Sequence, residues 1–82
     1  MKIRKANMNV HNQLLSNVYI YENKKEEYSL VAIPELEWSM TVKYEEERSS
    51  LRSRLTQSFE KKIDKEDAEQ LAEKIVQWTA EM

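Results

Sequence analysis

The alternation of apolar and polar residues predicts three strands in the middle of the chain. Residues 18–22 (VYIYE) alternate β-branched and aromatic side chains, and residues 28–33 (YSLVAI) are apolar on both faces over most of their length. The charged residues 23–27 (NKKEE) separate these two runs, which is typical of an antiparallel hairpin. Pro34 ends the second run because proline cannot donate to a sheet, and residues 37–44 (EWSMTVKY) then alternate cleanly as a third strand.

From Glu45 onward the hydrophobic period becomes helical. One narrow apolar row predicts a first helix; its residues are Leu51, Leu55, Phe59 and Ile63. Residues 45–47, all glutamate, are expected in the first turn of this helix, and the lysines at 61–62 in its last turn. Both placements would complement the helix dipole.

A second helix is predicted to begin after Asp64. This residue can cap the helix together with Asp67 in the manner of a capping box, and Ile63 can pack on Ala68 as a hydrophobic staple. The apolar face that follows is broad, and it consists of Ala68, Leu71, Ala72, Ile75, Val76 and Thr79.

The predicted fold is therefore α+β in the order β-β-β-α-α. A small antiparallel sheet of three strands would carry the two C-terminal helices on one face. Residues 17–82 form a single domain in this interpretation. Residues 1–16 are ambiguous, and they are expected to be either a basic N-terminal arm or a short edge strand.

Composition narrows the chemistry that this domain can perform. The 82 residues suffice for one small domain with a thin core. The chain has no cysteine, which excludes disulfides and thiol catalysis and favours the cytoplasm. It also has no glycine, so a phosphate-binding loop or a nucleophile elbow cannot occur in standard form, and tight turns are expected to use residues such as Asn17 and Asn23. We predict neither a signal peptide nor a membrane span.

Three sets of polar side chains could act in catalysis or metal binding, but the sequence shows no further residues of such a site near them. Glu35 and Glu37 would lie on one face of an extended chain with Cα atoms about 6.5 Å apart, a spacing that suits acid–base pairs. His11 is the single histidine. The third set is acidic and lacks the pattern of an EF-hand; it comprises Glu66, Asp67, Glu69 and Glu73. We interpret all three as solvated groups, and predict no enzyme, catalytic residue, metal ligand, cofactor or small-molecule substrate.

Aromatic residues on the predicted sheet suggest a surface for a protein partner. If Val18 and Ile20 face the core, Tyr19 and Tyr21 form an exposed aromatic strip. Such a strip suits a protein–protein interface. The candidate contact residues for a partner protein, or for a second copy in a homodimer, are Tyr19, Tyr21, Trp38 and Trp78.

Nucleic-acid binding is the alternative function. Its candidate residues form a basic N-terminal group and a helical group, namely Lys2, Arg4, Lys5, Arg48, Arg52 and Arg54. The net charge of −2 argues against this function, and nearby glutamates would neutralise part of the helical group. The two groups would have to lie on one side of the fold to form a single site.

Two stretches, VYIYENKKEEYSLVAIPELEW and KYEEERSSLRSRL, resemble the YueH-like family of small proteins from Bacillus-type bacteria, as does the chain as a whole. That resemblance implies a cytoplasmic bacterial protein and no particular activity. Residues 18–59 also show a more limited similarity to the HicB-type antitoxin core, through the corner Pro34-Glu35-Leu36 between two strands. The second proline and the glycine of that corner are missing here, so this similarity concerns the fold rather than the function.

Overall fold

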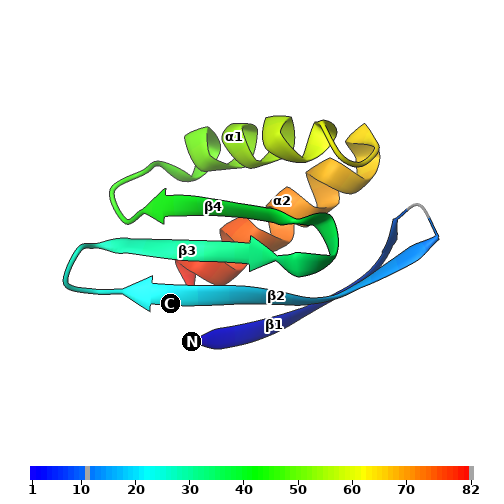
Figure 1. Cartoon of the computed structure of the whole chain (residues 1–82). Coiled ribbons are helices and arrows are strands. Elements are labelled where there is room, and N and C mark those ends of the chain that lie inside the picture. Colours follow the sequence, from blue (N-terminus) through cyan, green and yellow to red (C-terminus); the bar gives the residue numbers. More distant parts are fainter. Residues whose placement is uncertain (11, 82) are drawn as a thin grey trace.

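The protein folds into one antiparallel sheet with two helices on a single face (Figure 1). The structure is a computed structural model, and it describes residues 1–10 and 12–81. The elements in chain order are β1 (Lys2–Val10), β2 (Gln13–Asn23), β3 (Tyr28–Ile33), the 3₁₀ turn η1 (Pro34–Leu36), β4 (Trp38–Lys43), α1 (Arg48–Glu60) and α2 (Lys65–Ala80). The α+β class is confirmed, but the sheet has four strands in the order β1-β2-β3-β4 and not the predicted three.

The additional strand comes from the N-terminal residues that the sequence left ambiguous. β1 pairs with β2 from Lys2 opposite Ile20 to Val10 opposite Gln13, so the proposed boundary between residues 16 and 17 falls inside β2. Its inward side chains are core residues: Ala6, Met8 and Val10 are all buried. The N-terminal segment is therefore part of the domain.

The pairing of β1 with β2 contains a β-bulge. The pairing with β2 shifts register between Lys5 and Met8, where Asn7 adopts a φ of 50°. The extra residue in β1 bends the hairpin, while buried and exposed positions still alternate along β1 through Ala6, Met8 and Val10. In Figure 1 the far end of the β1–β2 hairpin curls toward the end of the molecule where the two helices meet. This curvature brings Met8, Val10 and Leu15 into the core.

The core lies between the helices and the inward face of the sheet. Val18, Ile20 and Val31 from the central strands are fully buried, as are Leu55 of α1 and Leu71 of α2. Two aromatic rings close the side near β4: Trp38 and Phe59 have centroids 4.3 Å apart. The indole nitrogen of Trp38 donates a 2.8 Å hydrogen bond to Ser58 Oγ, so its polar atom is satisfied inside the fold.

The first helix begins later than the sequence predicted. α1 starts at Arg48 with Glu47 as its N-cap, so residues 45–47 precede the helix and do not occupy its first turn. Lys61 and Lys62 likewise follow the last helical residue. The prediction that glutamates in the first turn and lysines in the last turn stabilise the α1 dipole is therefore wrong. Residues 45–47 form the connection from β4 to α1 instead.

The second helix agrees with the prediction in position but not in every contact. Asp64 is the N-cap of α2, and its side chain makes no capping hydrogen bond. The capping box with Asp67 is therefore not formed. Ile63 and Ala68 are both buried, as expected for a hydrophobic staple.

Asparagine and glutamate occupy the left-handed backbone positions in this chain without glycine. The described residues with positive φ are Asn7, Asn12, Glu27 and Glu37. The predicted turn residues Asn17 and Asn23 lie in β2 instead. Asn23 still supports the β2–β3 turn, because its side-chain oxygen accepts a 3.0 Å hydrogen bond from the backbone N–H of Glu26.

We expect Glu37→Gly to stabilise the protein. Glu37 ends η1 at φ 50° and ψ 48°, and its N–H donates a 2.9 Å hydrogen bond to the carbonyl of Pro34. A Cβ in this region costs about 1–2 kcal/mol, which glycine removes at a smaller cost in chain entropy. The free energy of unfolding in urea should rise by about 0.5 kcal/mol. Glu35→Gly in the same turn should lower it, and an equal loss in both variants would contradict this explanation.

Candidate functional site

The sheet has one face that the helices leave uncovered, which we call the open face. Residues directly opposite one another on neighbouring strands point to the same face. Tyr19 lies between Ile3 and Ala32, and Leu30 lies opposite Tyr21. On the open face the paired rows before the bulge contain Ile3, Lys5, Asn17, Tyr19, Tyr21, Asn23, Tyr28, Leu30, Ala32, Ser39, Thr41 and Lys43. Beyond the bulge the pair of Asn9 and Leu14 also points away from the core, and Leu14 is 54% exposed.

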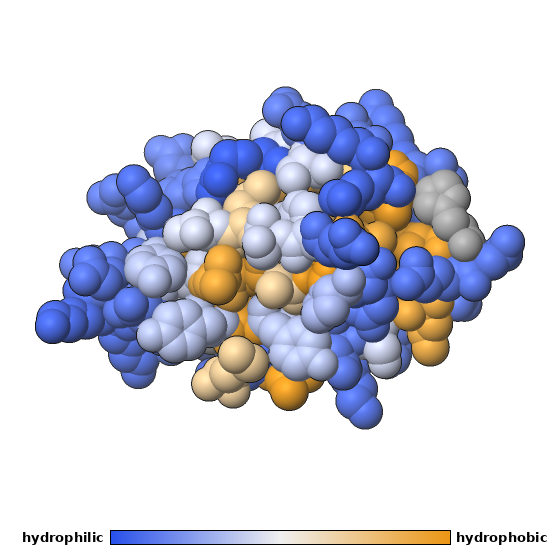
Figure 2. Space-filling view, viewed as in Figure 1, coloured by the Kyte–Doolittle hydropathy of each residue, from blue (hydrophilic) through white to orange (hydrophobic). Residues whose placement is uncertain are grey.

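Large apolar side chains are exposed on the open face. Ile3 is 55% exposed, Tyr21 42% and Leu30 38%. Figure 2 views the molecule from this side: pale and orange atoms extend across its centre to the lower edge, blue, hydrophilic atoms lie at the left and above, and further orange atoms lie at the right. Two long hydrogen bonds of 3.4 Å connect side chains on this face, from Asn17 to the Tyr19 hydroxyl and from Asn23 to the Tyr28 hydroxyl. These bonds restrain the rings along the sheet.

The structure brings together only part of the predicted contact set. Tyr19 and Tyr21 lie on the open face, because Val18 and Ile20 point into the core as the alternation required. Trp38 is buried against Phe59, so it is a core residue with little surface to offer a partner.

Trp78 belongs to α2, on the other side of the sheet from the open face, and packs against the core. Sequence reasoning missed the contributions of Ile3, Leu30 and Ala32 to the open face. The available signal for the last two was the run 28–33, which is apolar on both faces.

The two basic groups lie at opposite edges of the sheet. Lys2, Arg4 and Lys5 belong to β1, the first strand in the sheet order, whereas Arg54 of α1 reaches the carbonyl of Thr41 in β4, the last strand. The two groups therefore do not form a single surface.

Ion pairs also occupy two of the helical arginines. Arg54 donates to the Glu46 carboxylate at 2.6 and 3.0 Å, and this hydrogen bond raises the pKa of Arg54. Arg52 pairs with Glu73 at 2.6 Å. The 3.1 Å bond from Arg54 to Thr41 also occupies a backbone acceptor of β4, which is an edge strand. Occupied edge groups are less available for pairing with another strand.

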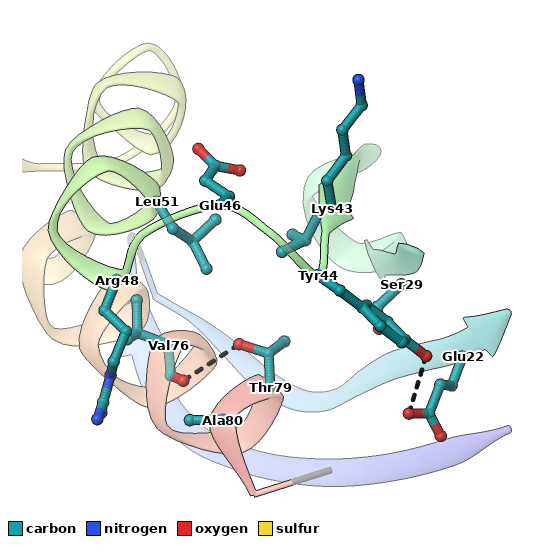
Figure 3. Close-up of a pocket in the computed structure, with 11 residues that line it drawn as sticks. Glu22, Ser29, Lys43, Tyr44, Glu46, Arg48, Leu51, Val76, Thr79 and Ala80 are labelled. Carbon is teal, nitrogen blue, oxygen red and sulfur yellow. Dashed lines mark hydrogen bonds between the residues drawn. The ribbon is translucent and has the colours of Figure 1, made fainter. Parts of the chain in front are cut away.

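A cavity of about 320 Å³ opens where β4 leads into α1 (Figure 3). Its apolar floor includes Val42, Leu51 and Val76, and the last turn of α2 forms one side. At the opposite side the Tyr44 hydroxyl donates a 3.0 Å hydrogen bond to the carboxylate of Glu22. Because Glu22 is held by Tyr44 and Glu46 by Arg54, both carboxylates around the cavity are already engaged within the protein.

Replacing Tyr44 by phenylalanine should remove a pH-dependent contribution to stability. The pKa of Tyr44 is raised above 10.0, first by partial desolvation, then by the hydrogen bond to Glu22 and by the negative charges of Glu22 and Glu27. The contribution is therefore complete below the unfolded-state pKa, and it is lost as the pH rises through the higher folded-state pKa. The difference in free energy of unfolding between wild type and Tyr44→Phe should shrink between about pH 8 and about pH 12.

Glu22→Gln provides the matched variant for this measurement. It removes the charge beside the phenol, so an absorbance titration should show the pKa of Tyr44 moving back toward its ordinary value. A difference between wild type and Tyr44→Phe that stays constant across this pH range would show that the hydrogen bond does not couple to ionisation.

The remaining polar candidates do not assemble into a site among the described residues. Glu35 lies in η1 and Glu37 in the left-handed position after it. The backbone between them is therefore not extended, and the prediction that the two carboxylates share one face of an extended chain is wrong. Residues 1–10 and 12–81 contain no group of three or more His, Asp or Glu side chains placed to hold a metal ion. His11 lies outside the described residues. No helix in the described part of the chain is long and apolar enough to cross a membrane.

These features define a small α+β domain whose helices cover one face of a four-stranded antiparallel sheet and leave the other face open. The sequence model of the YueH-like protein family matches residues 2–81, so the chain belongs to this family. The protein YueH of Bacillus subtilis (strain 168), which is described as uncharacterised, is 45% identical over 82 residues, covering all of both chains. No solved structure matches this chain. The similarity to the HicB-type antitoxin core is not shown by these comparisons.

Proposed function

We propose that this protein is a non-catalytic interaction module of the cytoplasm that binds a partner protein, or a second copy of itself, through the open face. The observation that carries the proposal is the exposure of Ile3, Tyr21 and Leu30 side by side on a sheet face that the fold leaves uncovered. The cytoplasmic location rests on the absence of cysteine from a chain of only 82 residues.

The chemistry of the open face is that of an interface core. Tyrosine is enriched at the centres of protein interfaces, because a rigid ring buries a large area at a small cost in conformational entropy. Three tyrosines lie on this face, at positions 19, 21 and 28, with Leu30 and Ala32 between them. Covering such side chains is favourable by about 25 cal/mol per Å² of apolar surface removed from water.

Other surfaces suit a partner less well. The β4 edge has its Thr41 carbonyl engaged by Arg54, and the two carboxylates that line the cavity, Glu22 and Glu46, are hydrogen-bonded within the protein. The basic groups at the two sheet edges are separated. The open face therefore combines exposed apolar area with a continuous, regular backbone, and it is the surface that we assign to binding.

Capture from host lysate with matched variants tests this function. The tagged wild type should retain one protein in stoichiometric amount at both low and high salt, since apolar contacts are not weakened by screening. The double variant Tyr21→Ser, Leu30→Ser should lose it by about tenfold or more. Gln57→Ser, which changes an exposed residue of α1, should retain it. Equal capture by the three proteins, or no capture by any, would argue against the open face as a binding surface.

A further inference from the structure

The outer edge of β4, the last strand of the sheet, is partly occupied by the protein itself. The carbonyls of Thr41 and Lys43 point outward, because they accept hydrogen bonds from Arg54 of α1 and from the N–H of Glu46. Both bonds are 3.1 Å long. Backbone groups of an antiparallel strand alternate between its two sides, so those of Ser39 face the same edge. The carbonyls of residues 41 and 43 are therefore closed to another strand.

Arg54 and Glu46 form a clamp over the Thr41 carbonyl. The Arg54 guanidinium donates from Nη2 to Glu46 Oε1 at 2.6 Å and from Nε to Glu46 Oε2 at 3.0 Å. A bidentate pair fixes the plane of the guanidinium, and the same Nη2 also donates to Thr41. The Glu46 side chain is only 16% exposed, which shields the clamp from water. One side chain of α1 thus holds both the edge of β4 and the connection that follows this strand.

The strand behind the clamp is suited to pair with a copy of itself. Residues 38–42 (WSMTV) contain no charge, proline or glycine, and such segments associate readily when their edge is free. In an antiparallel pair centred on Met40, Ser39 of one copy lies opposite Thr41 of the other. These opposite residues exchange their N–H and C=O groups, and hydroxyl pairs across strands are favourable. Because this pairing needs the Thr41 carbonyl, the clamp blocks it.

The sheet edge formed by β1 is protected in a different way. β1 begins with Lys2, Arg4 and Lys5, and its pairing with β2 contains a bulge. Like charges on two such edges repel, and a bulge interrupts regular pairing. β4 has a single cation, Lys43, at its end. It therefore lacks the charge protection of β1 and depends on the clamp.

Independently of the proposed function, we infer that the clamp of Arg54 and Glu46 is an autoinhibitory contact that conceals a homodimer interface at the β4 edge. While the clamp is closed, the chain does not pair through β4. When the guanidinium is displaced, two copies join their sheets edge to edge through residues 38–42. The dimer is weak, because so short a strand pair buries less than the roughly 800 Å² per partner of a stable interface.

Sedimentation equilibrium of clamp variants tests this inference on the full chain. In every sample Tyr21→Ser and Leu30→Ser remove large side chains of the open face, so that the open face contributes little to association. Arg54→Ala and Glu46→Ala should each raise the association constant by about tenfold, because each frees one backbone acceptor per copy. The two changes shift the net charge in opposite directions, so a shared effect cannot come from charge. Gln57→Ala, at an exposed position of α1, is the matched control.

Lysines on β4 distinguish edge pairing from other association. Ser39→Lys with Thr41→Lys adds cations at two exposed positions, and these cations meet when two β4 edges pair antiparallel. In the Arg54→Ala protein they should return the association constant to that of the control. Circular dichroism verifies the fold of each protein, and Glu46→Ala decides the test if Arg54→Ala does not fold.

Two results would overturn the inference. One is self-association of the folded clamp variants no stronger than that of Gln57→Ala. The other is association that persists after the two lysines are added, since the contact would then lie elsewhere. Because every sample lacks Tyr21 and Leu30, either result leaves the proposed function of the open face unaffected.

Discussion

Replacing Phe59 by alanine is expected to lower the free energy of unfolding by about 3–5 kcal/mol. Phe59 is fully buried, and its ring lies 4.3 Å from that of Trp38, where α1 meets β4. Removing the ring leaves a cavity that the surrounding backbone cannot close, because Trp38 is also held by its hydrogen bond to Ser58. A domain of this size has roughly 4–12 kcal/mol of stability in total, so the variant should be close to unfolding at room temperature.

Urea denaturation followed by tryptophan fluorescence measures this loss directly. Gln57→Ala is the matched control on the same helix, since Gln57 is exposed and its truncation should change stability by no more than about 0.5 kcal/mol. Similar midpoints for the two variants would mean that the contact between α1 and β4 is not part of the cooperative core.

Val10→Asp is expected to destabilise the protein by about 4 kcal/mol or more. Val10 ends β1 and is only 2% exposed, within the hydrophobic core cluster. A carboxylate there must either stay neutral or be buried without a partner, and both are costly. The expected result is loss of cooperative unfolding at neutral pH, measured by thermal denaturation and circular dichroism.

Asn9→Asp introduces the same charge one residue earlier, and it separates burial from charge. Asn9 is exposed, so this variant should unfold with a midpoint close to that of the wild type. If residues 1–16 were a loosely held arm, Val10→Asp would be as harmless as Asn9→Asp. The pair of variants therefore tests whether the N-terminal strand belongs to the fold.

The sequence by itself determined the elements whose patterns are local and regular. The hairpin of residues 18–33, the strand of residues 37–44 and the two amphipathic helices all follow from period-2 or period-3.6 alternation, which reports one buried side of an element. The placement of Tyr19 on the face opposite Val18 follows from the same rule. These features required no knowledge of what lies across the sheet.

The tertiary structure alone decided the features that depend on residues distant in sequence. β1 begins with the basic residues Lys2, Arg4 and Lys5, and it becomes a core strand because β2 supplies its hydrogen bonds across a bulge at Asn7. Trp38 is buried because Phe59 and Ser58 of α1 pack over β4. The open face exists because both helices pack on one side of the sheet. The hydrophobic pattern indicates which side chains gain from burial, whereas the tertiary packing determines which of them are buried.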